Sequence, residues 1–392
     1  MKDALNPFNP GSGTPPPALV GRDDELETLD VLVERSAYGR PGRGMVLTGL
    51  RGVGKTVLLN QMRRRAEAAG WFTVNLEARR DATGATAIRK TLAREMAAKA
   101  RSLGKSGIAQ RTRDALGSVA AFNLKLGSSG IDLGVEVVPG RADSGAIDVD
   151  FREVVEDLAG ALGDEGRTFG LFIDELQDLD TELLSALLVT QHAASQEGWP
   201  FYIIGAGLPG LPAGLATAHS YAERMFDYRP IGSLPTSAAA RALRDPIELA
   251  DASLDEDALA VLLEAARGYP FFLQTYGQAV WQVAPGPRIQ TEDAAAGVLL
   301  GLDRLDAGFF RARWDRATPA ERKMLVAMAE DNDQPSSSGV VADRMGMKPT
   351  SIGPHRASLI NKGLIYAPEH GQVAYTVPGM AAYVHRHRDD LV

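Results

Sequence analysis

Eight consecutive residues of this sequence have the types and spacing needed to bind the phosphates of a nucleotide. The segment reads GLRGVGKT, with lysine and threonine at its end. Glycines let successive backbone N–H groups turn around an anion, the lysine ammonium contacts the β- and γ-phosphates, and the threonine hydroxyl binds Mg²⁺. The motif predicts a phosphate-binding loop. With the first residue after the motif, the predicted nucleotide-binding residues are Gly49, Leu50, Arg51, Gly52, Val53, Gly54, Lys55, Thr56 and Val57.

A pair of acids further along the chain complements this loop. Asp174 and Glu175 directly follow the apolar run 169–173, which predicts a buried strand. Alone, such a pair is also typical of a strand that ends in a solvated acidic loop. Downstream of a phosphate-binding loop, it favours a magnesium site at Asp174, shared with Thr56, and a catalytic role for Glu175 in polarising the attacking water. Lys55 is the other predicted catalytic residue of this set.

Strands and helices alternate around these motifs. Each apolar run is followed by a stretch with apolar residues at helical spacing. Such alternation is typical of an α/β fold with a parallel sheet, and with the phosphate-binding loop it predicts a P-loop NTPase core over residues 19–234. The apolar runs lie at 45–48, 72–76, 169–173 and 199–207.

One segment departs from the alternation. Between residues 120 and 137, Phe122, Leu124 and Leu126 alternate with polar residues, and Gly127 begins a small-residue turn before a second apolar series. Alternation on both sides of such a turn predicts a β-hairpin inserted into the core. We expect it either to cover its own domain or to contact a partner.

The rest of the chain predicts two further units. Residues 235–316 are rich in Ala and Leu, lack a strand pattern, and predict a helical lid with a linker helix. Residues 317–392 predict three short helices and a hairpin, an order typical of a winged helix-turn-helix that places a helix in the DNA major groove. The candidate DNA-binding residues are Lys348, Thr350, Ser351, His355 and Arg356.

Composition limits the partners. The 392 residues carry a formal net charge of −8, so binding to double-stranded DNA would require a local basic patch. Residues 321–392 hold eight Lys or Arg and eight Asp or Glu, which leaves protein as an alternative partner. The sequence has no cysteine and no apolar run long enough to span a membrane. We expect a cytoplasmic protein whose residues 1–18, rich in Pro and Gly, form a flexible tail.

With these motifs in place, the chain resembles the AAA+/STAND-like P-loop ATPases, and among them the archaeal-ATPase-like members with a C-terminal winged helix. The resemblance implies ATP and Mg²⁺ as ligands. It also implies that Val20, Gly21 and Arg22 pass close to the adenine, and that Pro270, in a Gly-x-Pro motif, packs against the nucleotide. Arg224 is similar in place to the arginine finger that reaches a neighbouring subunit in a homo-oligomer.

Two departures from that family pattern bear on the activity. The run 199–207 ends in Gly-Ala-Gly where many members have a polar residue, and Gly-x-Pro stands where many have a lid arginine. Both favour a slow nucleotide switch over a fast motor. The first hypothesis is therefore an ATPase whose nucleotide state controls DNA binding. The second is a STAND-type signalling switch whose winged helix binds protein, while a small-molecule kinase would leave the winged helix and the acid pair without roles.

Overall fold

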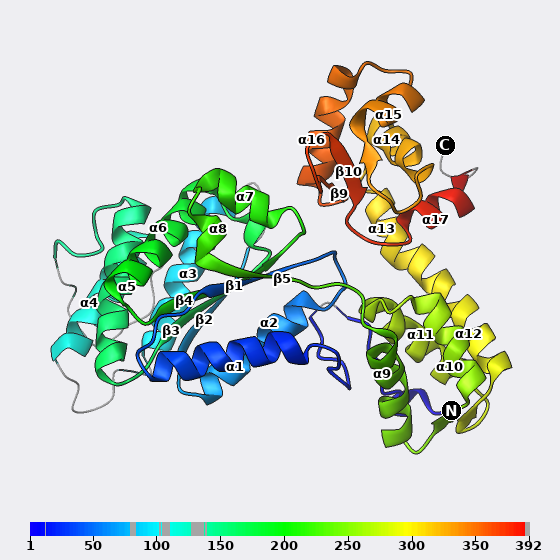
Figure 1. Ribbon diagram of the computed structural model, residues 1–392, viewed down its shortest axis with the longest axis horizontal. Coiled ribbons are helices and arrows are strands. Elements are labelled where there is room, and N and C mark those ends of the chain that lie inside the picture. Colours follow the sequence, from blue (N-terminus) through cyan, green and yellow to red (C-terminus); the bar gives the residue numbers. More distant parts are fainter. Residues whose placement is uncertain are drawn as a thin grey trace.

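The structure is a computed structural model that describes residues 1–11, 13–78, 84–101, 103, 110–126, 137 and 139–388. Its elements form three groups (Figure 1). A sheet covered by helices lies at one side, a group of four long helices lies at the other, and a small group at the C-terminus lies above the latter. We call the second group, α9–α12, the helical unit and the third, α14–α17, the C-terminal unit.

The sheet has five parallel strands in the order β2-β3-β4-β1-β5. Apolar side chains alternate between its two faces: Met45 and Leu47 pack with α1 and α2, whereas Val46 packs with the opposite layer. A parallel sheet buried on both faces confirms the predicted α/β core. The strands are β1 (Gly44–Thr48), β2 (Phe72–Glu77), β3 (Phe169–Asp174), β4 (Phe201–Gly207) and β5 (Phe226–Pro230).

Helices cover both faces of this sheet. Most of the apolar residues that were expected at helical spacing lie in them and are buried. An Asp180 side chain caps one of these helices by accepting a hydrogen bond from the Leu183 amide at 3.0 Å. The helices around the sheet are α1 (Asp23–Ala37), α2 (Lys55–Ala68), α3 (Gly84–Ala100), α4 (Gln110–Lys125), α5 (Ile147–Asp164), α6 (Thr181–Glu197), α7 (Leu211–Ala218) and α8 (Ala222–Met225).

The predicted hairpin at residues 120–137 is wrong in its first arm. Residues 120–125 are the end of helix α4, and Leu126 follows it. Leu116, Val119 and Phe122 are spaced three apart and are buried against α5 and its neighbours, while Leu124 is 65% exposed. Helical packing of this stripe prevails over the local alternation. The second arm falls mostly outside the described residues.

The helical unit contains the helices predicted from the Ala- and Leu-rich segment. A short parallel pair, β6 (Ser253–Leu254) and β7 (Arg288–Ile289), joins two of its connections. Its last helix continues through a π-helical turn, η3 (Leu305–Phe310), into α13 (Arg311–Trp314), which leads to the C-terminal unit. The helices are α9 (Thr236–Leu249), α10 (Glu256–Ala266), α11 (Pro270–Val283) and α12 (Thr291–Arg304).

The N-terminal segment is not the flexible tail expected from its composition. Phe8 is 2% exposed and packs on α11, and the Trp281 indole N–H of that helix donates to the Lys2 carbonyl at 3.0 Å. A short helix, η1 (Asp3–Leu5), lies between Lys2 and Phe8. Figure 1 accordingly shows the N-terminus beside α10 and α11, away from α1. Burial of the Phe8 ring, together with the hydrogen bonds to α11, opposes the conformational entropy that the segment loses on ordering.

The C-terminal unit combines short helices with a three-stranded sheet in the order β8-β10-β9. The two last strands are antiparallel, as predicted for the hairpin at 364–377. Among the described helices, none is both long and apolar enough to cross a lipid bilayer. The elements are α14 (Pro319–Ala329), β8 (Ser336–Ser337), α15 (Ser338–Arg344), η4 (Pro349–Ile352), α16 (Gly353–Asn361), β9 (Ile365–Tyr366), β10 (Gln372–Tyr375) and α17 (Met380–Arg386).

Candidate nucleotide-binding site

The predicted phosphate-binding loop connects β1 to α2 at the carboxyl edge of the parallel sheet. Gly52 and Gly54 have φ angles of 86° and 91°, which glycine adopts without strain. A Cβ atom on Gly49 would lie 2.1 Å from the Ile231 carbonyl oxygen, so this position has no room for a side chain. The glycines therefore let the loop turn sharply and place the N-terminus of α2, with its partial positive charge, beside the loop.

Lys55 is the first residue of α2 and lies within the loop. Its ammonium donates hydrogen bonds to the carbonyls of Gly49 and Leu50, both at 2.9 Å. The side chain is buried, and burial lowers the pKa of Lys55 to about 8, although the negative charges of Glu175 and Asp174 oppose the shift. An anion placed in the loop would favour the charged form. The ammonium is thus held close to the space where phosphates would lie.

Thr56 and Asp174 join the two sequence motifs directly. The Thr56 hydroxyl donates to an Asp174 carboxylate oxygen at 2.6 Å, over a sequence separation of 118 residues. Asp174 ends β3 and is 9% exposed, and burial raises its pKa, while the bond from Thr56 acts in the opposite direction. Two oxygen ligands beside a phosphate-binding loop fit the preference of Mg²⁺ for hard oxygen donors.

Glu175 has both of its carboxylate oxygens engaged. An Arg51 guanidinium nitrogen lies 3.4 Å from Oε1, and the Gln177 amide donates to Oε2 at 2.6 Å. The backbone of Glu175 is left-handed, with φ 52°, which is uncommon for a residue with a Cβ atom and marks strained positions at functional sites. Gln177 also accepts a bond from the Leu208 amide at 3.1 Å, so it links Glu175 to the end of β4.

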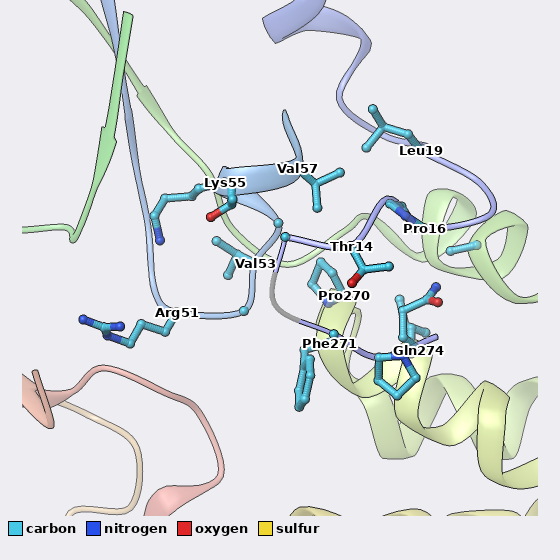
Figure 2. Close-up of a pocket in the computed structure, with 18 of the residues that line it drawn as sticks. Thr14, Pro16, Leu19, Arg51, Val53, Lys55, Val57, Pro270, Phe271 and Gln274 are labelled. Atoms are coloured by element: carbon cyan, nitrogen blue, oxygen red, sulfur yellow. The ribbon is translucent and has the colours of Figure 1, made fainter. Parts of the chain in front are cut away.

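A cavity of about 460 Å³ lies between the loop, α11 and the N-terminal segment. Ligand sites for molecules of nucleotide size have volumes in this range. Figure 2 shows Lys55 and Val57 above the cavity and Pro270, Phe271 and Gln274 of α11 below it. Among the predicted nucleotide-binding residues, those that line it are Val20, Arg22, Arg51, Gly52, Val53, Gly54, Lys55, Thr56, Val57 and Pro270, and the catalytic candidate Glu175 lines it as well.

The residues before α1 support the loop as well as the cavity. The buried Arg22 guanidinium donates to the Val53 carbonyl at 3.1 Å and to the Gly232 carbonyl at 2.6 Å. Gly21 has φ 67°, and a Cβ atom there would lie 2.6 Å from the Ala238 side chain. Pro270 begins α11, a helix position that suits its fixed φ. Gly21, Gly49 and Leu50 are not among the described residues that line the cavity.

Two sets of lining residues were missed by sequence reasoning. The first is Arg313 of α13, whose guanidinium lies 3.8 Å from the ring centre of Phe309 and donates to the Phe309 carbonyl at 2.6 Å. The second is a segment that we call the strap, residues 9–11 and 13–16. An isolated arginine in a charged helix and a Pro-rich segment carry no motif. The buried Phe8 beside the strap was the one available signal.

Several predicted residues lie elsewhere. Arg224 is exposed on α8 and is not among the described residues that line the cavity. Lys348, Thr350 and Ser351 are exposed at η4, which begins the predicted third helix. His355 and Arg356 are half-buried in α16, and no described group pairs with the buried Arg356 Nε. None of these five candidate DNA-binding residues is among the described residues that line the cavity.

Comparisons with known proteins agree with the core of this site. Residues 18–204 match the AAA ATPase domain, and residues 307–384 match a domain of unknown function. No curated protein matches the sequence significantly.

Solved structures resemble the whole chain. A Walker-type ATPase of Pyrococcus abyssi is 15% identical with a TM-score of 0.61, covering 97% of this chain and 99% of that chain, and supports the same fold. The Cdc6p protein of Pyrobaculum aerophilum is 14% identical with a TM-score of 0.45, covering 100% and 99%. The ORC1 protein of Aeropyrum pernix, solved in complex with DNA, is 15% identical with a TM-score of 0.43, covering 95% and 94%.

Proposed function

We propose that this AAA+ P-loop ATPase is a slow, nucleotide-dependent switch that couples ATP to DNA binding through a C-terminal winged helix. The main support for the proposed nucleotide binding is the hydrogen bond from Thr56 to Asp174. It joins the phosphate-binding loop to the acid pair at 2.6 Å, beside the buried Lys55. These are the groups that phosphoryl transfer requires, because its catalysis depends on positioning and on compensation of phosphate charge.

Each group has a role in this proposal. Backbone N–H groups of the loop and Lys55 bind the phosphates, and Arg22 holds the loop backbone in place. Thr56 and Asp174 would hold Mg²⁺, which supplies charge neutralisation at the phosphates. Glu175 orients and polarises the attacking water. If the chain assembles into a homo-oligomer, the exposed Arg224 would compensate phosphate charge in a neighbouring subunit.

The engagement of Glu175 supports slow hydrolysis. Its carboxylate is paired with Arg51 and accepts from Gln177, so both contacts hold its orientation and compete with water for its lone pairs. The end of β4 carries Gly205, Ala206 and Gly207, and none of these has a polar side chain that would hold the water instead. A nucleotide that is hydrolysed slowly can keep a switch in one state.

The C-terminal unit carries the proposed DNA contact. A helix, a turn and a second helix followed by an antiparallel hairpin are the parts of a winged helix. Lys348, Thr350 and Ser351 present a cation and two hydroxyls at the exposed start of the second helix. Such residues contact phosphates and base edges in modules of this kind. The balanced charge of the unit limits the contact to this local patch.

A second candidate, a STAND-type switch that binds protein, has its own supporting observation. The Arg51 amide of the loop donates to the Thr376 carbonyl of the C-terminal unit at 3.0 Å. The unit therefore contacts the nucleotide site directly. In this alternative, nucleotide exchange breaks that contact and frees a protein-binding surface.

Steady-state ATP hydrolysis tests the proposal, measured for the wild type, Lys55→Ala and Glu175→Gln, with and without duplex DNA, at two salt concentrations. We expect Lys55→Ala to lose nucleotide binding, and Glu175→Gln to retain ATP without turnover. A change in rate on adding DNA at low salt supports the DNA-coupled switch. A rate that is indifferent to DNA, together with ATP-dependent oligomers, favours the protein-binding alternative, and unaltered hydrolysis in Glu175→Gln contradicts its catalytic role.

A further inference from the structure

The first eight residues are attached to the helical unit by contacts that their composition does not suggest. Besides the bond from Trp281 to Lys2, the Asn6 amide donates to the Gln278 carbonyl at 3.0 Å. The Asn6 side chain also accepts from the Phe8 amide at 3.0 Å, which fixes the backbone just before the strap. The bonds from Trp281 and to Gln278 both join the segment to one helix, α11, whose first residues line the cavity.

Phe8 is the centre of this attachment. Its side chain is 2% exposed and lies against Gly277 of α11. A Cβ atom on Gly277 would lie 2.7 Å from the Phe8 ring, a separation too short for real atoms. Glycine in a helix interior costs about 1 kcal/mol relative to alanine. Because Gly277 has no side chain, the Phe8 ring can pack directly against the backbone of α11.

From Phe8 the chain crosses the cavity. Asn9, Pro10, Gly11, Gly13, Thr14 and Pro16 line it. Gly13 lies directly beside the loop, since a Cβ atom there would be 3.2 Å from the methyl group of Thr56. In Figure 2, Thr14 and Pro16 lie between Val57 of α2 and Gln274 of α11. The strap thus lines the cavity between the phosphate-binding loop with α2 on one side and α11 on the other.

The strap leaves the site open for a ligand. With the strap in place, the cavity keeps a volume of about 460 Å³, and residues 51–56 of the phosphate-binding loop border it. The strap therefore encloses the space beside the loop and does not fill it. Its proline residues restrict the backbone, which lowers the entropy lost in holding one conformation.

We propose that the strap is part of the nucleotide-binding site and that Phe8 is a positioning residue that holds it there. Detaching Phe8 from Gly277 would open one wall of the cavity, so bound nucleotide would leave faster. The nucleotide would still meet the phosphate-binding loop, because Phe8 packs on α11 and is not among the described residues that line the cavity. This inference rests on the proposed nucleotide binding and adds a means by which the helical unit controls nucleotide residence.

The test measures the release rate of a fluorescent N-methylanthraniloyl ATP or ADP, displaced by excess unlabelled nucleotide. Phe8→Ala removes the ring, and Gly277→Ala fills its place from the other side while favouring the helix. We expect release at least about fivefold faster in both variants. Leu5→Ala is the matched control, since Leu5 lies in the same segment but is 63% exposed, and we expect it to release nucleotide at the wild-type rate.

The double variant Phe8→Ala/Gly277→Ala separates this role from general loss of stability. If both changes act by detaching the strap, the double variant releases nucleotide no faster than either single one. Wild-type release rates in both single variants would overturn the inference and leave the proposed function standing. Multiplying effects would overturn it too, because the two sites would then act independently. A wild-type protein that binds no nucleotide would overturn the proposed function, and the inference with it.

Discussion

Arg51 of the phosphate-binding loop and Glu175 after β3 form an ion pair, with 3.4 Å between a guanidinium nitrogen and Oε1. The same arginine donates its backbone amide to Thr376 of the C-terminal unit. One residue therefore connects the loop, the candidate water-polarising acid and the part of the chain that is proposed to bind DNA. The position of the C-terminal unit can therefore be sensed at Glu175 through Arg51.

The ion pair makes a first prediction for turnover. Arg51→Gln removes the charge that holds Glu175, so we expect kcat to rise about two- to fivefold, since ion pairs of this exposure contribute about 0.2–1 kcal/mol. Steady-state hydrolysis at saturating ATP measures it. The variant Arg51→Gln/Glu175→Gln is the control and should not turn over. A kcat at or below the wild-type value, with ATP binding retained, would show that the pair does not restrain Glu175.

Lys55 makes the affinity for ATP depend on pH. In the nucleotide-free protein its pKa is about 8 because the side chain is buried. Bound phosphates stabilise the ammonium and raise that pKa, so binding above pH 8 requires uptake of a proton. Affinity is therefore constant below pH 8 and falls as pH rises, to about a tenth at pH 9. Calorimetry at pH 7.5 and 9 checks this, and Lys55→Arg, which stays charged, should show no decrease.

Arg313 is expected to contribute to binding of the phosphates. Burial, with the nearby charges of Arg316 and Arg51, lowers its pKa to about 10, and no carboxylate in the described chain forms an ion pair with it. Its Nε has no hydrogen-bond partner among the described groups. A phosphate in the cavity would supply the missing negative charge. Arg313→Gln should thus weaken ATP binding about tenfold or more, since bonds to charged groups contribute about 1.5–3 kcal/mol.

A matched control for this change lies on the same helix. Arg311 is exposed and forms an ion pair with Asp315 at 3.0 Å, so Arg311→Gln alters charge without touching the cavity. Equilibrium binding of ATP to both variants, with their unfolding temperatures measured alongside, makes the comparison. Equal affinities for the two variants would mean that Arg313 serves only to pack against Phe309.

DNA binding gives a prediction in which salt is the readout. Lys348→Ala with Arg356→Ala should weaken duplex binding and reduce the slope of log affinity against log salt by about 2, because each phosphate contact contributes about 1. Titration at three salt concentrations measures both. Lys323→Ala removes an exposed lysine from α14 and is the control. An unchanged slope in the double variant would move the partner of the C-terminal unit from DNA to protein.

The sequence predicted the centre of the site because its chemistry is local. A glycine-rich loop between an apolar strand and a helix restricts where Lys55 and Thr56 can lie, and parallel pairing brings Asp174 to the same edge. β5 was not predicted. It lies at the edge of the sheet, and Asp227 and Arg229 interrupt any apolar run. An edge strand needs only one neighbour and one buried face, so its sequence signal is weak.

Other features depend on contacts between distant segments. The stripe of Leu116, Val119 and Phe122 selects a helix only when α5 is there to cover it. The strap follows Phe8, whose ring packs against α11. The ring fits there because Gly277, 269 residues away in sequence, lacks a side chain. Arg313 lines the cavity from α13, which follows the π-helical turn η3 and is far in sequence from the phosphate-binding loop. The periodicity and composition of one segment do not predict which distant segment it will contact.

That turn places two adjacent rings in different surroundings. The Phe309 ring stacks on Phe271 beside the loop at 4.7 Å between centres, and the Phe310 ring stacks on Tyr383 of α17 at 5.5 Å. Cutting the chain here would leave each fragment with an exposed aromatic surface. The two stacked pairs therefore connect the packing beside the phosphate-binding loop with the packing of α17, so we expect a change at either ring to affect both.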